Sequence, residues 1–436
     1  MKKRSTLRPV GLLLIALAAM AAATAYATGP LYVGGPGTGE GFPFVWNINP
    51  LTYWTDQGNL GSLGNTAAND LVQQAFQAWQ SVPTSTLTFS PAGALSTDIQ
   101  TGAQYLSLEN DLNNCFVPLP PGSLAKGRSI IYDTDGSILQ DLGEDPNSIL
   151  GFATALCFTT TGANNNFNRG LALINGKSVT GPSSTTEVKA VMTHEFGHMI
   201  GLDHSQINLD CLTVGPGAPS CDLQGLPTMF PVLIDAVEMS TLATDDIAGI
   251  SALYPTSNFA SSTGRITGHV LFSYGQTPAQ GFNVIARKTD NPLVIAVSNV
   301  SGFLFTADAG NPVYPWPGSD FGSRDPALIG FYDIPGLPPG DYTVGVEAIH
   351  NSEPIPFVLG SGLGPIGDLG FQFPLPSLLP TPPPCTPEYL VSGATATCSS
   401  AAAAVIPVAA GSAVSTGTDV ILIGTPPRYD AWEDGP

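Results

Sequence analysis

Residues 193–205 read THEFGHMIGLDHS, and the fold and chemistry of the chain follow from this stretch. It places His194, Glu195, His198, Gly201 and His204 in the spacing H-E-x-x-H-x-x-G-x-x-H. Residues four apart lie one turn apart on one helix face, so His194 and His198 can point at one cation while Glu195 stands beside it. Gly201 is predicted to end the helix, because glycine tolerates the left-handed conformation common there, and the chain then returns His204 to the metal.

Three neutral imidazoles leave one tetrahedral position of a zinc ion open to water, which is typical of a catalytic zinc site. Zinc lowers the pKa of that water and polarises a peptide carbonyl, while Glu195 takes the proton and passes it to the leaving amine. The predicted reaction is peptide hydrolysis without a covalent intermediate. The alternative is an ordinary amphipathic helix with surface histidines. Of the five histidines only His269 and His350 lie outside this window, which favours the metal site.

The window resembles the metzincin clan of zinc peptidases and, within it, the matrixins, the family of the matrix metalloproteinases. Ser205, directly after the third histidine, is the residue that matrixins carry there. Residues 226–232 (LPTMFPV) resemble the Met-turn, with Met229 as the methionine beneath the zinc. On its own, a methionine in an apolar run is more often core filler.

Residues 242–255 (LATDDIAGISALYP) are similar to the closing helix of matrixin catalytic domains. From the residues alone, Thr244, Asp245 and Asp246 suit a helix N-terminus, where side-chain oxygens cap free amides and negative charge meets the positive end of the dipole. Capping explains both carboxylates, so neither is assigned to the mechanism.

The fold class predicted for the chain is α+β. The resemblance implies a metzincin catalytic domain over residues 28–257, with a twisted mixed sheet and three main helices. Residues 44–54 look like its opening strand, and residues 67–82 have apolar side chains at helical period. Residues 86–90 and 128–132 read as strands because they are rich in β-branched and aromatic side chains.

The helix that carries the histidines has its own start signal. Ser184 and Glu187 form S-x-x-E, which predicts a capping box. A buried stripe is expected from Val188, Val191, Met192, Phe196 and Met199.

The residues before this helix are read as a polar loop, 162–169 (GANNNFNR), followed by an apolar strand, 171–174. By analogy with matrixins, residues 171–175 are expected to line the cleft and pair with extended substrate. Residues 232–240, after the Met-turn, are expected to form an apolar wall of the pocket beside the cut bond.

Asp133 and Asp135 follow a strand as D-T-D-G and leave two readings open. Calcium could take oxygen ligands at alternate positions, whereas a tight turn needs no ion, and the EF-hand spacing is not met. The resemblance also implies a second, structural zinc held by histidines before the active-site helix. This chain has no histidine before His194, so only the catalytic zinc is expected.

Residues 1–27 have the pattern of a signal peptide: a basic start, an apolar run and an Ala-Tyr-Ala cleavage site. Export is therefore expected, without membrane insertion after cleavage. The formal net charge of -20 argues against nucleic acid or anionic membrane as a partner. The zinc motif and the resemblance to matrixins imply a protein or peptide substrate instead. No segment resembles the P-R-C-G-x-P-D latency motif of matrixin propeptides.

Six cysteines fit an exported protein and fall as near neighbours in sequence. Disulfides are favoured over metal ligation because no C-x-x-C pair is present, although six cysteines permit 15 pairings. The neighbouring pairs are Cys115 with Cys157, Cys211 with Cys221, and Cys385 with Cys398.

A domain boundary is predicted near residue 257, where the composition turns to Ser, Thr, Asn and Pro. Residues 258–358 alternate as strands do, and resemble carboxypeptidase regulatory-like domains, which are β-sandwiches with a transthyretin-like topology. Residues 359–436 contain a proline-rich connector and a pair of strands that either complete the sandwich or form a separate unit.

Two functions follow from these observations. The first is a secreted zinc-dependent endopeptidase with Glu195 as general base and His194, His198 and His204 as metal ligands. The second is an extracellular binding or adhesion protein that retains the zinc fold with weak or no catalysis. The complete set of four residues favours the first, because a drifted site would most simply have lost one of them.

Overall fold

The structure is a computed structural model. It describes residues 29–35, 39–115, 119, 123–161, 164–181, 184–205, 207–208, 211, 218–272, 277–279, 281–304, 323, 325–348, 385 and 387–423. The predicted signal peptide, His350 and most of the proline-rich connector lie outside these residues. None of the helices in the described ranges has the length and apolar character needed to cross a membrane.

The first half of the chain builds a six-stranded mixed sheet. Its strands run in the order β1-β6-β4-β2-β3. β1 pairs with the first part of β6 and β4 with its second part, whereas β5 pairs along almost the whole of β6. All pairs are parallel except the antiparallel β5–β6 hairpin. The strands are β1 (Phe44–Trp46), β2 (Leu51–Thr55), β3 (Phe89–Ala94), β4 (Arg128–Asp133), β5 (Gly151–Thr161) and β6 (Asn164–Asn175).

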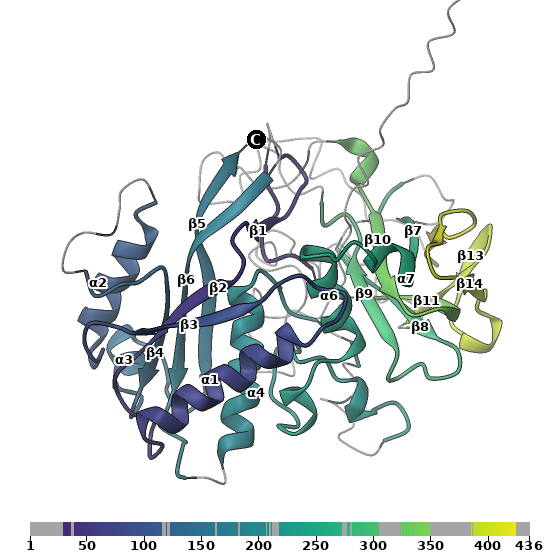
Figure 1. Cartoon of the computed structure of the whole chain (residues 1–436). Helices are drawn as coiled ribbons and strands as arrows, with labels where there is room; N and C mark the ends of the chain where they lie inside the picture. Colours follow the sequence, from purple (N-terminus) through teal and green to yellow (C-terminus); the bar gives the residue numbers. More distant parts are fainter. Residues whose placement is uncertain are drawn as a thin grey trace, which may run out of the picture.

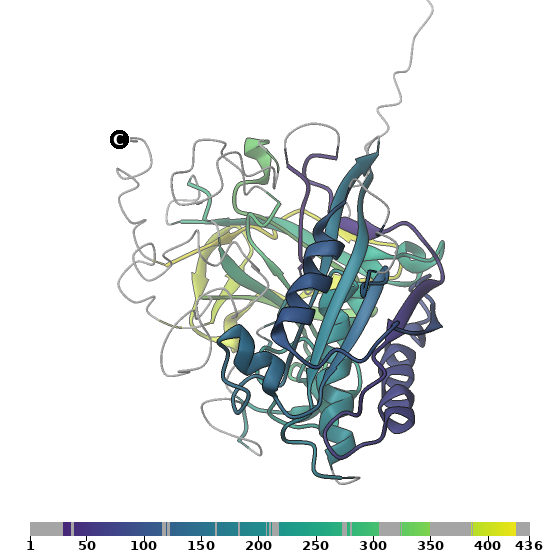
Figure 2. The same ribbon diagram turned by 90° about the vertical axis from the view of Figure 1, so that its left-hand side faces the viewer.

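Helices cover both faces of this sheet, because its central strands are apolar on both sides. Ile130 and Tyr132 face the core shared with α1 and α4, whereas Ile131 between them faces the core shared with α2 and α3. Figures 1 and 2 show the two layers on opposite sides. The helices are α1 (Asn65–Gln80), α2 (Gly102–Asn113), α3 (Ser137–Leu142), α4 (Thr185–Met199), α6 (Thr244–Leu253) and α7 (Phe259–Ser262).

The helices predicted at 67–82, 184–199 and 242–255 correspond to α1, α4 and α6. α1 buries the predicted apolar stripe, with Trp79 fully inside. α2 is an additional helix that the sequence reading does not predict.

Two of the predicted strands begin or end elsewhere. Residues 44–54 form two strands, β1 and β2, with a bend at Asn47–Pro50 where proline cannot donate a ladder hydrogen bond. The side chain of Asn49 in this bend accepts from the backbone N–H of Thr88. That contact keeps residues 86–88 outside the sheet, so β3 begins only at Phe89.

The prediction of a loop over 162–169 is wrong for the residues that the structure describes, because β6 begins at Asn164. Asn165 has its side chain buried, where its amide donates to the carbonyls of Gly39 and Phe42. The expected substrate edge at 171–175 is also wrong. Those residues pair with β4 on one side and β5 on the other, so both of their edges are occupied.

The second half of the chain forms a ten-stranded sheet, which we call the C-terminal β region (the described residues of 264–423). Its apolar side chains converge on one core. The strands are β7 (Gly264–Leu271), β8 (Phe282–Lys288), β9 (Ala296–Val300), β10 (Phe331–Leu337), β11 (Gly340–Ala348), β12 (Glu388–Val391), β13 (Ala394–Thr397), β14 (Ile406–Val408), β15 (Ala413–Val414) and β16 (Val420–Ile421).

Strands from the last part of the chain are integrated into this sheet. β12 and β14 pair with β11, and β15 and β16 pair with β7. Of the two arrangements left open by the sequence, the strands after residue 387 therefore complete the sheet. His269 lies in β7. The whole chain is α+β, with a mixed sheet and helices followed by a sheet-rich region (Figure 1).

The helix α6 belongs to both halves of the molecule. Ile250 and Leu253 pack in the core of the first half, whereas Ala248 packs in the core of the C-terminal β region. At Gly336, at the end of β10, an added Cβ would lie 2.7 Å from the Cβ of Ala248. The two halves therefore meet in close contact along this helix.

Short 3₁₀ turns and three disulfides complete the described structure. The disulfides are Cys115–Cys157, Cys211–Cys221 and Cys385–Cys398, so each joins neighbouring cysteines, one of the 15 pairings that the sequence leaves open. The turns are η2 (Leu223–Gly225), η3 (Glu238–Ser240), η4 (Pro326–Leu328) and η6 (Ser400–Ala402).

Candidate metal centre

The helix α4 is held rigidly from the side opposite the histidines. All five residues of the predicted stripe are buried. The ring of Phe196 stacks on that of Phe76 in α1 with 4.1 Å between centroids, and the indole N–H of Trp79 donates to the Thr193 carbonyl at 2.9 Å. The histidines thus project from a helix whose neighbouring residues, Thr193 and Phe196, are held by α1.

The start of α4 differs from the prediction. Ser184 is the residue before the helix, but its side chain does not cap the backbone. Instead its hydroxyl donates to the carbonyl of Gly181 at 2.7 Å. The predicted capping box is therefore wrong, because a local carbonyl competes for the serine hydroxyl.

The end of α4 is fixed by glycine geometry and by aromatic donors. Gly201 has φ +100°, and a Cβ there would lie 2.9 Å from the ring of Phe167. The last carbonyls of the helix accept from side chains: that of Met199 from the Trp46 indole at 2.9 Å, and that of Ile200 from the Tyr254 hydroxyl at 2.6 Å. These bonds satisfy carbonyls that a helix end otherwise leaves without partners.

The three imidazoles converge on one point. The Nε2 atoms of His194 and His198 are 3.2 Å apart, those of His198 and His204 3.1 Å, and those of His194 and His204 3.3 Å. Ligands at about 2.0–2.1 Å from a tetrahedral zinc lie about 3.3–3.4 Å from one another. The triangle of nitrogens therefore fits a zinc ion, and among the described residues it is the group of side chains able to hold a metal.

The other ring nitrogens fix the tautomer of two ligands. His194 Nδ1 lies 2.7 Å from the Thr228 carbonyl and His198 Nδ1 lies 2.9 Å from the Leu202 carbonyl. A carbonyl can only accept, so each Nδ1 carries the proton and each Nε2 presents a lone pair. Burial lowers the pKa of His194 to about 4 and that of His198 to about 3, which keeps both rings neutral at physiological pH.

His204 is carried by a segment that is tied down on both sides. The carboxylate of Asp203 accepts from the His204 backbone N–H at 2.7 Å, and the Asp203 N–H donates to the Gly29 carbonyl at 2.9 Å. The Leu31 N–H donates to the Gly201 carbonyl at 2.7 Å. Residues near the start of the described chain therefore brace the return that brings His204 to the other two rings.

Glu195 is buried against the beginning of β5. A Cβ at Gly151 would lie 2.9 Å from the Leu173 carbonyl oxygen and 3.3 Å from Glu195 Oε1, so the glycine lets β5 pass close to the carboxyl. Burial raises the pKa of Glu195 to about 8, and a hydrogen bond from the Ala153 backbone N–H partly offsets this. In the metal-free protein this carboxyl therefore binds a proton readily at neutral pH.

A pocket of about 440 Å³ opens beside the three rings. His194 and Glu195 form its polar end. Its other walls come from the segment after Met229, from α4 and from the residues before β5, and they include Phe230, Val232, Leu233, Met239 and Ile149. The apolar wall expected from residues 232–240 is present.

Met229 packs against the helix α4 at Gly197. It is fully buried, and a Cβ added at Gly197 would lie 2.1 Å from its Sδ. Its carbonyl accepts from the Ser205 N–H at 2.9 Å. The turn around Met229 therefore contacts both the helix and the segment that follows His204.

Asp246 supports the centre in a way that the sequence reading misses. Its carboxylate accepts from the N–H groups of Thr228 at 2.8 Å and Met229 at 3.0 Å, and also from that of Ala243 at 2.8 Å. The Thr228 carbonyl in turn orients His194. Only the last of these contacts is the local helix cap predicted from the sequence; the other two span 17 and 18 residues.

Asp133 and Asp135 lie away from the three histidines and bind backbone amides. The carboxylate of Asp133 accepts from the N–H groups of Gly136, Ile138 and Leu139 at 2.9–3.1 Å. Asp135 accepts from the Ser137 N–H at 3.1 Å. These bonds form the tight turn that is one of the two interpretations of this stretch.

Residues 45–214 match the family model described as Matrixin. The match spans less than half of the chain and includes all three histidines and Glu195. No curated protein matches the chain. The match supports a matrixin-like catalytic domain, for which a zinc-dependent metallopeptidase activity is expected, and the three-histidine cluster fits the zinc site of that family.

Proposed function

We propose that the protein is a secreted zinc-dependent endopeptidase. The observation that carries this proposal is the triangle of Nε2 atoms 3.1–3.3 Å apart, with the Nδ1 atoms of His194 and His198 bound to carbonyls. The Nε2 atoms of His194 and His198 both present lone pairs 3.2 Å apart, and such nitrogens repel one another unless a cation lies between them. His194, His198 and His204 are the proposed ligands, Gly201 ends the helix that presents two of them, and Met229 supports them from below.

Zinc, when bound, would supply a Lewis acid that polarises the peptide carbonyl and makes a water molecule more acidic. Glu195 is the proposed general base: it accepts the proton of the attacking water and returns it to the nitrogen of the leaving amine. Its pKa of about 8 in the metal-free site means that burial favours the protonated form. A nearby cation lowers that pKa and restores the base.

The substrate is proposed to bind as an extended peptide along β5. Gly151 to Thr154 lie next to Glu195, and no other described strand pairs with the outer edge of β5. Backbone groups at such an edge can add a peptide strand regardless of its sequence. The apolar pocket beside His194 then selects an apolar side chain next to the cut bond.

The proposal also covers export, the domain bounds and the metal content of the protein. Residues 1–27 would direct export, which suits a chain with three disulfides. The catalytic domain is proposed to span residues 28–257, with a β-sandwich like those of carboxypeptidase regulatory-like domains from residue 258. One zinc is proposed per chain, and calcium at Asp133 and Asp135 has no support beyond the spacing of those residues.

The test compares the purified protein with its Glu195→Gln variant. The unaltered protein is expected to bind one zinc per chain and to cleave casein or a broad peptide library, and a chelator should abolish cleavage. Glu195→Gln keeps the three ligands, so it should still bind one zinc while losing at least about 10²-fold in kcat/KM, the contribution of a general base.

A binding protein that retains the zinc fold gives a different result. Zinc bound at one per chain, with no cleavage of any peptide in the library, would replace the peptidase by that second function. Failure of the protein to bind zinc would contradict both the peptidase and the zinc-binding alternative.

A further inference from the structure

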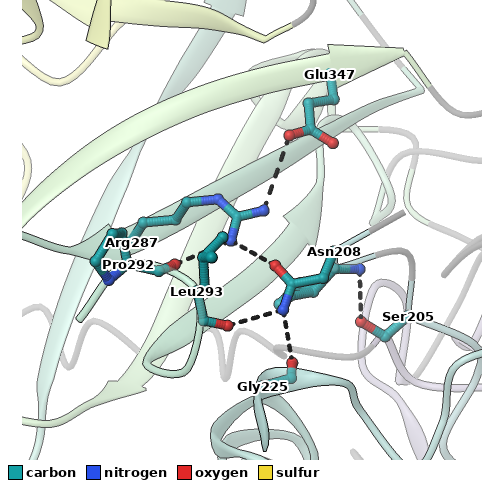
Figure 3. A network of polar contacts seen from close by, with 8 residues as sticks. Ser205, Asn208, Gly225, Arg287, Pro292, Leu293 and Glu347 are labelled. Carbon is teal, nitrogen blue, oxygen red and sulfur yellow. Dashed lines mark hydrogen bonds and ion pairs between the residues drawn. The ribbon is translucent and has the colours of Figure 1, made fainter. Parts of the chain in front are cut away.

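The C-terminal β region reaches the surroundings of the metal centre through Asn208, four residues after His204. Asn208 is buried and has φ +61°, a conformation that asparagine tolerates better than most residues. Its side-chain amide donates to the carbonyls of Leu293 at 2.8 Å and Gly225 at 3.1 Å. Its Oδ1 accepts from Arg287 in β8 at 2.9 Å (Figure 3).

The guanidinium of Arg287 is oriented by its own region. It donates to the Pro292 carbonyl at 3.0 Å and lies 3.9 Å from Glu347 in β11 (Figure 3). Contacts within the β region thus orient the guanidinium, and its Nη1 also donates to Asn208. Ile207, next to Asn208, packs against Ile285 and Ala296, so apolar contact accompanies the polar one.

Backbone packing closes this contact. At Gly225, a Cβ would lie 1.8 Å from the Leu293 carbonyl oxygen. Gly225 lies three residues before Thr228, whose carbonyl orients His194. The loop between β8 and β9 therefore touches the segment after the third ligand and the segment that leads to Thr228.

A second, independent contact joins β9 to α6. The N–H of Ser298 donates to Asp245 Oδ1 at 2.7 Å, and its hydroxyl lies 3.3 Å from both carboxylate oxygens. Asp245 is buried. The next residue, Asp246, holds the N–H groups of Thr228 and Met229, so this contact also leads to His194.

We propose that the C-terminal β region is a structural part of the metal centre. Arg287 and Ser298 are positioning residues: they hold Asn208 and Asp245, and through them the segments that place His204 and orient His194. This inference rests on the proposed function and extends it, because it makes metal retention depend on a region outside the family match.

The experiment measures how fast the full-length chain releases zinc to an excess of chelator. Arg287→Ala and Asn208→Gly remove the first contact, and glycine keeps the positive φ. Both are expected to release zinc about tenfold faster, the lower end of the effect of losing a residue that supports a ligand. The visible absorption of the Co²⁺-substituted protein should shift in the same variants, since it reports ligand geometry without requiring catalysis.

Two variants serve as controls. Lys288→Ala removes the neighbouring cation of β8, whose ion pair with Asp290 stays within its own loop, and it should leave the rate and spectrum unchanged. Arg287→Lys keeps a donor near Asn208 and should give an intermediate rate. If Arg287→Ala does not fold, as judged by circular dichroism, Asn208→Gly carries the comparison.

Release rates within twofold of the unaltered chain in Arg287→Ala and Asn208→Gly would overturn the inference. An equal acceleration in Lys288→Ala would overturn it as well, because the effect would then not depend on Asn208. Either result leaves the proposed function standing if the unaltered chain binds zinc and cleaves peptides. A chain that binds no zinc would overturn the proposed function itself.

Discussion

Gly197 lies between the two helical histidines, and its lack of a side chain makes room for Met229. A Cβ there would lie 2.1 Å from Met229 Sδ and 3.0 Å from the indole of Trp79, and both neighbours are fully buried. The helix and the Met229 turn can therefore approach each other only at a glycine.

Gly197→Ala is expected to destabilise the protein by up to about 2 kcal/mol. Overpacking costs about 1–3 kcal/mol, and the gain in helix propensity of about 1 kcal/mol offsets part of it. Urea unfolding measures the difference. Gly64→Ala is the control, because a Cβ at Gly64 meets no atom within 4 Å. Equal stabilities for the two variants would contradict the packing argument.

The buried histidines give the metal-free protein a defined pH dependence. The pKa of His198 is about 3 when folded and about 6.5 when unfolded, so below pH 6.5 the unfolded chain binds a proton that the folded chain does not. Acidification therefore lowers the free energy of unfolding by up to about 1.4 kcal/mol per pH unit from this group.

Buried acids act in the opposite direction, since burial raises the pKa of Asp56 and of Asp246 to about 7 and that of Glu195 to about 8. The quantity that isolates His198 is thus the difference in the free energy of unfolding between the unaltered protein and His198→Gln. This difference should shrink between pH 6.5 and pH 5 in chelator-treated samples, measured by urea unfolding. A difference that is constant over this range would show that His198 does not titrate as its burial implies.

At the scale of the elements, helix starts that look alike in sequence differ in the structure. Thr101 before α2 accepts from the Gln104 N–H, whereas Ser184 before α4 donates to a carbonyl instead. Thr101→Ala should therefore cost about 1 kcal/mol, and Ser184→Ala less than about 0.5 kcal/mol. Thermal unfolding of both variants tests the comparison, and a larger loss at Ser184 would contradict it.

The sequence predicts the elements that depend on local signals. The stripe from Val188 to Met199, the stop at Gly201 and the strand at β4 all follow from spacing or from the conformational needs of one residue. β5 and the first half of β6 do not, because Thr-rich and Asn-rich stretches carry no clear alternation. Their pairing is stabilised by contacts far away in the chain, such as that of Asn165 with Gly39.

The same limit applies to the metal centre. Its proposed ligands and Glu195 can be named from spacing because zinc requires particular side chains. Its supports are mostly backbone groups, such as the carbonyls of Thr228 and Leu202, which every residue possesses. Asp245 and Asp246 were visible as cap residues, but their long-range partners depend on tertiary structure.

At the scale of the whole molecule, the shared helix α6 couples the two halves. Because Ala248 packs in one core and Ile250 in the other, neither core can open fully without disturbing this helix. We expect a single cooperative unfolding transition. Pulse-labelling hydrogen exchange in urea should give the same midpoint for amides of α4 and of β8, and two separate midpoints would contradict the coupling.

The position of α6 also decides where this chain could be divided for module exchange. If the C-terminal β region were exchanged at residue 257, where the composition changes, Ala248 would pack against a different surface. Asp245 would also lose its hydrogen bond from Ser298. A chimaera that accepts a new C-terminal module would need to take the helix Thr244–Leu253 from the donor of that module. It would also need a turn around Met229 whose N–H groups can bind the acid at position 246. The recombination point set by packing therefore lies ahead of the one suggested by composition.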